Sequence, residues 1–160
     1  MENQNNEIRH YFNLNYRISN HLAGGISFNV SLIVDTNTKK IIGKGNITQA
    51  VNPPLNIPTI LSGDYSYMCT MNSCNILVVM EGVSPYSPLI LGAPQPIQNV
   101  KLRMSLEDDW KSGTATYSFL LDGKWVDVGY QKVELVELSD ELNVDKLSSF
   151  VKEQNLETSL

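Results

Sequence analysis

The stretch KSGTATYSFLLDGKWVDVGYQKVELVEL, residues 111–138, has the pattern of two β-strands joined by a tight turn. Asp122-Gly123 separates the two β-rich runs, and this dipeptide suits a type I′ turn, whose two central residues both need a positive φ. On the second run, the parity of the apolar positions changes between Tyr130 and Val133. We therefore predict a β-hairpin with a bulge near Gly129.

The remaining sequence before residue 107 also favours strands. Apolar and polar residues alternate from Phe12 to Ile18 and, most regularly, from Ile26 to Asp35, as is typical of half-buried strands. Turn-forming residues separate the runs, and Pro58 is expected to delay the start of one strand. The strands predicted in this way cover residues 10–18, 26–35, 40–50, 59–71, 75–80 and 99–106.

About eight short strands with turn signals between them predict an all-β, antiparallel fold. Residues 83–98 hold four of the seven prolines, so this segment cannot lie inside a sheet and is interpreted as a long connection. A long connection favours two sheets, so we expect a β-sandwich, with a closed β-barrel as the alternative. A parallel α/β fold is excluded because crossover helices are missing.

After residue 138 the apolar period becomes helical, and Ser139 or Asn143 can cap the helix. The sequence therefore predicts one β-domain over residues 8–138 and an acidic amphipathic helix over 139–154. A disordered leader is expected over residues 1–7 and a tail over 155–160. The apolar face of the helix, formed by Leu147, Phe150 and Val151 together with Val144, either packs on its own sheet or contacts a partner.

Composition limits the function. With 42% apolar residues among 160, the chain has a globular composition, and no apolar run approaches the length of a transmembrane helix. The polar N-terminus lacks a signal pattern, so we expect a cytoplasmic protein, with signal-less export as an alternative. Cys69 and Cys74 flank a predicted turn; free thiols are expected in the cytoplasm, and a bridge is expected in an oxidising compartment.

Charge is distributed unevenly. Residues 1–133 hold ten acidic residues and ten lysines or arginines, so the whole net charge of −5 lies between residue 134 and the C-terminus. No basic patch is available to neutralise phosphates, so nucleic-acid binding is not expected. A neutral body permits self-association, whereas the acidic segment opposes it.

The proline-rich segment provides the strongest candidate for a contact site. Tyr86, Leu89, Ile90 and Leu91 lie on a segment that prolines stiffen, and they can present an apolar patch to a protein partner or a membrane. The alternative is that Leu89 to Leu91 close one end of the core. Tyr65, Tyr67, Trp110 and Trp125 can form an aromatic binding surface, but ordinary packing within a sheet is the simpler interpretation.

No catalytic motif is present, so we do not expect an enzyme and assign no catalytic residue and no cofactor. The only weak metal candidates are Glu107, Asp108 and Asp109, whose carboxylates suit Ca²⁺. The simpler interpretation of these three residues is a solvated turn stabilised by side-chain to backbone hydrogen bonds.

Three stretches, GNITQAVNPPLNI (residues 45–57), SGDYSYM (62–68) and NVKLRMSLEDDWKSGTATYSFLLDGKW (99–125), resemble a family of small bacterial proteins that is defined only as a domain of unknown function. The resemblance covers about residues 26–133. It implies a bacterial source and a β-rich fold, and it implies no activity or cofactor. The helix lies outside the resemblance.

Together these features predict a non-enzymatic binding or assembly module that self-associates or binds a protein. A small acidic protein directed to lipids, of the kind represented by the cytolysin-like β-sandwiches, is the alternative. An enzyme or calcium-binding protein with an unrecognised site is the second alternative.

Overall fold

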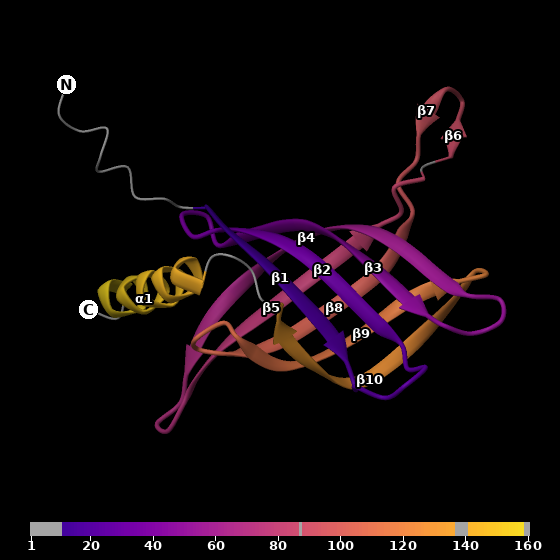
Figure 1. Cartoon of the computed structure of the whole chain (residues 1–160). Coiled ribbons are helices and arrows are strands. Elements are labelled where there is room, and N and C mark those ends of the chain that lie inside the picture. The colour runs from indigo at the N-terminus through magenta and orange to yellow at the C-terminus, as the bar shows by residue number, and fades with distance from the viewer. Residues whose placement is uncertain (1–10, 87, 137–140, 159–160) are drawn as a thin grey trace.

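The computed structural model describes residues 11–86, 88–136 and 141–158, except for the side chains of Ile90 and of residues 141–143 and 157–158. Figure 1 shows a barrel of antiparallel strands with a helix at one end and a protruding hairpin at the other. The strands are β1 (Tyr11–Ser19), β2 (Ser27–Asp35), β3 (Lys40–Gln49), β4 (Leu55–Cys69), β5 (Cys74–Val83), β6 (Leu89–Ile90), β7 (Ala93–Pro94), β8 (Gln98–Glu107), β9 (Ser112–Leu121) and β10 (Lys124–Leu135), and α1 (Glu141–Thr158) follows them.

The eight long strands form one closed sheet in the order β1-β10-β9-β8-β5-β4-β3-β2. The all-β, antiparallel prediction is therefore confirmed, and the barrel alternative is the architecture observed. The preference for a sandwich was wrong because residues 84–97 do not cross between sheets. They are inserted between β5 and β8, which pair directly with each other. The barrel closes where β1 meets β10 over a short seam, from Tyr16 opposite Leu135 to Ser19 opposite Lys132.

The hairpin β9–β10 matches its sequence pattern closely. Asp122 and Gly123 have φ values of 51° and 77°, as a type I′ turn requires. The register shifts between Val128 and Gln131, so one extra residue bulges out of β10 near Gly129. Both predictions for this hairpin are confirmed.

Inward-facing side chains fill the barrel, as expected for eight strands. Two inward-facing glycines allow tight strand coiling: a Cβ atom at Gly63 or Gly113 would come within about 2 Å of a carbonyl oxygen on the neighbouring strand. The prediction that Pro58 precedes a strand was wrong, because β4 begins at Leu55. Pairing with β5 starts only at Ile60, so the missing N–H of Pro58 has no partner to lose on that side.

One end of the barrel, here called the helix end, is formed by the turns 36–39, 70–73 and 108–111 and by α1. Val144, Leu147 and Val151 of α1 are buried against the barrel. Two side chains of α1 also hydrogen-bond to turn carbonyls: Ser148 Oγ donates to Asp108 O at 2.7 Å, and Gln154 Nε2 donates to Thr36 O at 3.0 Å. The helix thus packs on its own chain, and it runs from residue 141 to residue 158, longer at its C-terminus than predicted.

Beneath the helix, Trp110 closes the interior of the barrel. It has a φ of 66° and is 1% exposed. Its carbonyl accepts a 2.6 Å hydrogen bond from the hydroxyl of Tyr16. Its ring packs edge-on against Tyr65, with the ring centroids 5.2 Å apart.

The hairpin β4–β5 extends past the helix end. Cys69 and Cys74 lie directly opposite each other, with Cα atoms 4.0 Å apart, and form a disulfide. The expectation of free thiols was therefore wrong for this structure, and the bridged alternative holds. The two residues form a cross-strand pair because Thr70 N bonds Ser73 O and closes the turn between them.

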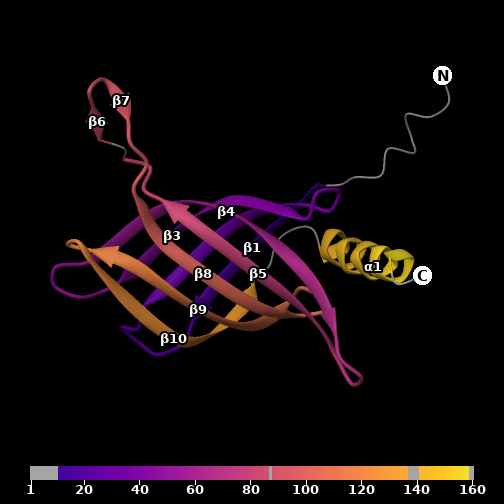
Figure 2. The ribbon, with the colours of Figure 1, turned by 180° about the vertical axis from the view of Figure 1, so that it is seen from behind.

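The opposite end of the barrel, seen from behind in Figure 2, is here called the arm end. It consists of the loops 20–26 and 50–54, the turn 122–123, and the inserted segment 84–97, which we call the arm. Among the described residues, no helix is long and apolar enough to cross a membrane.

Candidate functional site

The arm is an ordered hairpin that projects from the barrel (Figures 1 and 2). Ser84 N donates to Ile97 O at 2.8 Å and closes its base, and Gln95 N donates to Pro88 O at 3.0 Å higher up. At the tip, the short strands β6 and β7 are joined by Leu91 and Gly92, whose φ values are 54° and 81°. A positive φ at both residues defines another type I′ turn, so the arm has a preformed backbone.

The apolar side chains of the arm face solvent. Tyr86 is 77% exposed, Leu89 72% and Leu91 103%. Leu89 and Leu91 therefore do not close the core, and that alternative was wrong. The side chain of Ile90 lies outside the described part of the structure. An apolar patch held out on a stiff hairpin is typical of a contact surface.

The whole arm end is poor in charge. Its four segments hold a single carboxylate, Asp122, and no lysine or arginine. Several large apolar side chains elsewhere at this end of the barrel are also exposed: Leu22, Val51, Leu121, Trp125, Val126 and Tyr130. The arm is thus the most prominent of several exposed apolar sites at this end. Sequence reasoning missed Leu22 and Val51 because each lies alone in a short loop, and only the fold brings these loops to the same end of the barrel as the arm.

The helix face does not offer the partner contact that was predicted for it. Leu147 is completely buried and Val151 is 3% exposed, so neither can be reached by a partner in this structure. Phe150 is half-buried beside them. The reason is that Trp110 closes the barrel here with an apolar surface, and α1 covers that surface. These residues belong to the core and are not part of the candidate site.

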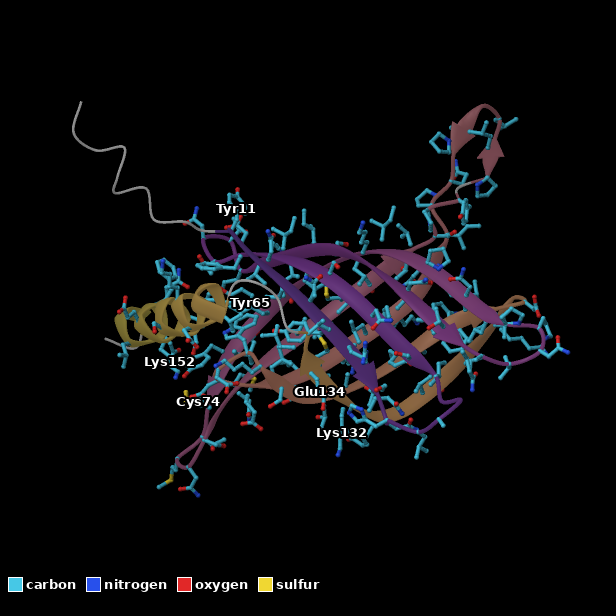
Figure 3. The ribbon with its side chains drawn as sticks, in the orientation of Figure 1. Tyr11, Tyr65, Cys74, Lys132, Glu134 and Lys152 are labelled. Atoms are coloured by element: carbon cyan, nitrogen blue, oxygen red, sulfur yellow. A yellow bond between two sulfur atoms is a disulfide. The ribbon has the colours of Figure 1, made fainter. Side chains whose placement is uncertain are left out.

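The acidic corner is used for local structure. Asp109 Oδ1 accepts the N–H of Lys111 at 2.9 Å, which is the turn bond proposed as the simpler interpretation. Asp108 forms an ion pair with Lys152 at 3.4 Å, and Figure 3 places Lys152 at the helix end. Glu107 ends β8. Among the described residues, no group of three or more His, Cys, Asp or Glu side chains could hold a metal ion.

The only described histidine is His21, because His10 lies outside the described residues. His21 Nε2 lies 3.1 Å from the carboxylate of Glu134, and both side chains are about half exposed. Within the described part of the chain no hydroxyl or thiol hydrogen-bonds His21. The nucleophile that would complete a catalytic triad is therefore not in place beside this pair.

Buried tyrosines are the strongly perturbed titratable groups. Burial raises the pKa of Tyr65 to about 12, with a smaller contribution from the negative charge of Asp35. Burial also raises the pKa of Tyr16, helped by Asp109, and that of Tyr117. All three are core residues that desolvation keeps neutral. The proposed aromatic surface is not formed, because Tyr65 and Trp110 are buried at the helix end, whereas Trp125 lies near the arm end.

The fold and the exposed arm define the molecule as a closed, filled eight-stranded meander barrel that carries a projecting apolar hairpin. A family model described as a domain of unknown function (DUF1842) matches residues 10–125. This match covers well over half of the chain, so the protein belongs to this family, and the resemblance seen in the sequence is confirmed. The matched segment includes the arm and ends before α1. Comparison with curated proteins gives no match.

Proposed function

We propose that this protein is a non-enzymatic assembly module that self-associates through its arm end. The observation that supports this function is the exposure of Tyr86, Leu89 and Leu91 on a preformed, uncharged hairpin. The core cluster forms without these three residues, so their exposure has no role in folding, although single apolar side chains such as Ile42, Ile60 and Met71 are exposed elsewhere.

A β-rich protein with this sequence can associate through a free sheet edge, through its proline-rich segment or through its C-terminal helix. The barrel leaves only residues 124–131 of β10 unpaired beside the short seam with β1, and a bulge and the charges of Lys124 and Asp127 disfavour pairing of this edge with a second chain. The helix already buries its apolar face on its own chain. The arm is the remaining route, and its apolar side chains are accessible.

Charge supports a second copy of the chain as the partner. The net negative charge lies in residues 134–160, and the described part of α1 belongs to the opposite end of the barrel from the arm. Two copies that meet arm end to arm end keep their acidic helices far apart. Such a contact buries apolar surface, and it can be a closed two-fold interface because the same patch is used twice.

Light scattering over a wide concentration range tests this proposal. We expect the full chain to reach twice the 17.9 kDa of one copy as concentration rises. The double variant Leu89→Ser/Leu91→Ser should stay monomeric because it removes the apolar tip. Met71→Ser is a matched control, since Met71 is equally exposed but lies on the β4–β5 hairpin at the helix end.

The proposal fails if the full chain remains monomeric at every concentration. It also fails if the double variant associates as strongly as the full chain. The melting temperature of each variant must match that of the full chain, so that loss of folding is not mistaken for loss of contact.

One observation favours the lipid-directed alternative. The exposed aromatic residues near the arm end, Tyr86, Trp125 and Tyr130, are of the amphipathic kind that suits a membrane interface. The loops and the arm at this end hold no lysine or arginine, and Lys124 beside Trp125 is the nearest cation on β10, so anionic lipids find little to attract them. Flotation with zwitterionic vesicles separates the two functions: retention of the full chain and loss of retention in the double variant would favour lipid over self-association.

A further inference from the structure

A second feature lies on the outer wall of the barrel, away from the arm. A shallow groove of about 440 Å³ crosses β1, β2 and β3, and Val136 contributes to its lining. Its polar lining comes from outward-facing residues of these three strands: Asn15, Arg17, Asn29, Ser31, Lys44 and Asn46. The groove therefore presents amides, a hydroxyl and two cations.

The strand register arranges these side chains in two neighbouring rows. Arg17, Asn29 and Asn46 stand opposite one another across the three strands, and Asn15, Ser31 and Lys44 form the adjacent row. Arg17 and Lys44 occupy opposite corners. Two strand spacings and two residue steps separate their Cα atoms by roughly 12 Å, a span that two long side chains can close around a small molecule.

The cations of the groove have no ion-pair partner among the residues that the structure describes. Neither Arg17 nor Lys44 forms an ion pair with another described residue, and no carboxylate is among the described residues that line the groove. Glu134 stands opposite Arg17 in the register and its carboxylate contacts His21 at 3.1 Å, so its single negative charge offsets part of the two positive charges of the groove and leaves an excess of positive charge. In a protein with a net charge of −5, this groove is a local positive site.

The groove also contains an acceptor that needs a donor. The side-chain carbonyl oxygen of Asn46 is buried and has no hydrogen-bond partner. A buried acceptor without a donor is costly, and a ligand hydroxyl can supply that donor once the Asn46 side chain turns toward the groove. Asn15 is already engaged, since its carbonyl accepts a hydrogen bond from Ser31 Oγ.

We infer that this groove binds a small polyhydroxylated anion, either a sugar acid or a sugar phosphate. Arg17 and Lys44 pair with the anionic group, because charge-assisted hydrogen bonds to a guanidinium or an ammonium are the strong ones. A ring hydroxyl donates to Asn46, and the remaining amides orient the other hydroxyl groups.

A second groove shows why charge composition matters. About 380 Å³ in volume, it crosses β5, β8, β9 and β10 and is lined by Glu81, Lys101, Arg103 and Asp127 among others. Its two acids offset its two bases, and Lys101 already stacks over the ring of Trp125 at 4.6 Å. It therefore offers no net attraction to an anion.

NMR titration of the ¹⁵N-labelled full chain tests the inference with glucuronate, glucose 6-phosphate, inorganic phosphate and glucose as separate probes. We expect glucuronate or glucose 6-phosphate to cause saturable shifts at amides of β1, β2 and β3, and to bind more tightly than phosphate or glucose. Tighter binding of glucuronate would identify the ligand as a sugar acid, and tighter binding of glucose 6-phosphate would identify it as a sugar phosphate. Arg17→Ala and Lys44→Ala should each weaken binding roughly tenfold.

Two further variants keep the result specific. Asn46→Ala should weaken both sugar probes and leave inorganic phosphate unchanged. Lys132→Ala, which removes an exposed cation on β10 (labelled in Figure 3) outside the groove, should bind as the full chain does. The inference is overturned if neither sugar anion gives saturable shifts, if phosphate binds as tightly as they do, or if the Arg17 and Lys44 variants bind unchanged.

Discussion

The two ends of the barrel treat apolar side chains in opposite ways. At the helix end, Trp110 closes the interior and α1 covers it with Val144, Leu147 and Val151, all of them buried. At the arm end, Leu89 and Leu91 have the same chemistry but stand in solvent on a projecting hairpin. Apolar residues at the first end stabilise the fold, whereas those at the second contribute little to it and are available for contact.

The charges follow the same division. The helix end carries carboxylates and lysines that pair across its elements, such as Lys152 with Asp108 and Lys111 with Asp145. The four segments of the arm end carry a single carboxylate, Asp122, and no lysine or arginine, and the nearest charges on β10 are Lys124 and Asp127. Charged side chains therefore keep the surface of the helix end hydrated. The surface of the arm end has few of them, as expected of a surface that a partner covers.

The largest expected effect separates a buried leucine from an exposed one. Leu147→Ala should lower the free energy of unfolding by about 2–5 kcal/mol, because it leaves a cavity between α1 and the barrel. Leu91→Ala should change it by less than about 0.5 kcal/mol, since Leu91 has no contacts to lose. Urea unfolding of both variants measures the difference, and equal losses would contradict the division between the two ends.

A smaller effect compares two buried hydroxyls. Tyr16→Phe should cost about 1–2 kcal/mol, because the carbonyl of Trp110 loses its donor at the helix end. Tyr117→Phe should be neutral or stabilising, since the Tyr117 hydroxyl is buried without a partner. Thermal unfolding of the two variants decides the matter, and a loss confined to Tyr117→Phe would show that the Tyr16 bond does not hold Trp110.

The same tyrosines predict alkaline sensitivity. Burial raises the pKa of Tyr65 to about 12, while an unfolded tyrosine titrates near its ordinary value of about 10. The unfolded state therefore loses its proton first, so this stabilisation is complete below about pH 10 and declines as pH rises toward 12. Unfolding measured between pH 9 and about pH 12 should show falling stability, with a shallower slope in Tyr65→Phe; an unchanged slope would contradict this assignment.

The smallest effect concerns the ion pairs at the helix end. Lys152→Ala should cost less than about 1 kcal/mol, because both partners are partly exposed and water screens the pair. Added salt should shrink the loss further. Lys146→Ala, a change at an exposed position on the same helix, serves as the control in urea unfolding. If Lys152→Ala lost nearly as much stability as Leu147→Ala, the view that apolar packing holds α1 would be overturned.

Local signals in the sequence were reliable guides. Asp122-Gly123 predicted the turn, and the change of parity before Val133 predicted the bulge, because both depend on neighbouring residues. The face of α1 was also predicted from its spacing. The partner of that face could not be, since the same stripe of Leu147 and Val151 fits a foreign groove or the chain's own barrel equally well.

Closure of the barrel had no local signal. It depends on Tyr16 pairing with Leu135, far apart in the sequence, and nothing near either residue indicates that contact. The exposure of Leu89 and Leu91 could not be predicted either, because composition does not distinguish apolar residues that close the core from apolar residues at the tip of an exposed hairpin. The groove on β1, β2 and β3 was missed for a similar reason: Arg17, Lys44 and Asn46 look like ordinary outward-facing strand residues until register brings them together.

Hydrogen exchange measured at low and high protein concentration tests the central claim most directly. The account predicts that concentration slows exchange in the arm, residues 84–97, and in the loops 20–26 and 50–54. Exchange in α1 and in the turn 108–111 should not change. Protection that grows instead on α1 or on the β4–β5 hairpin, or that grows nowhere, would contradict association through the arm end.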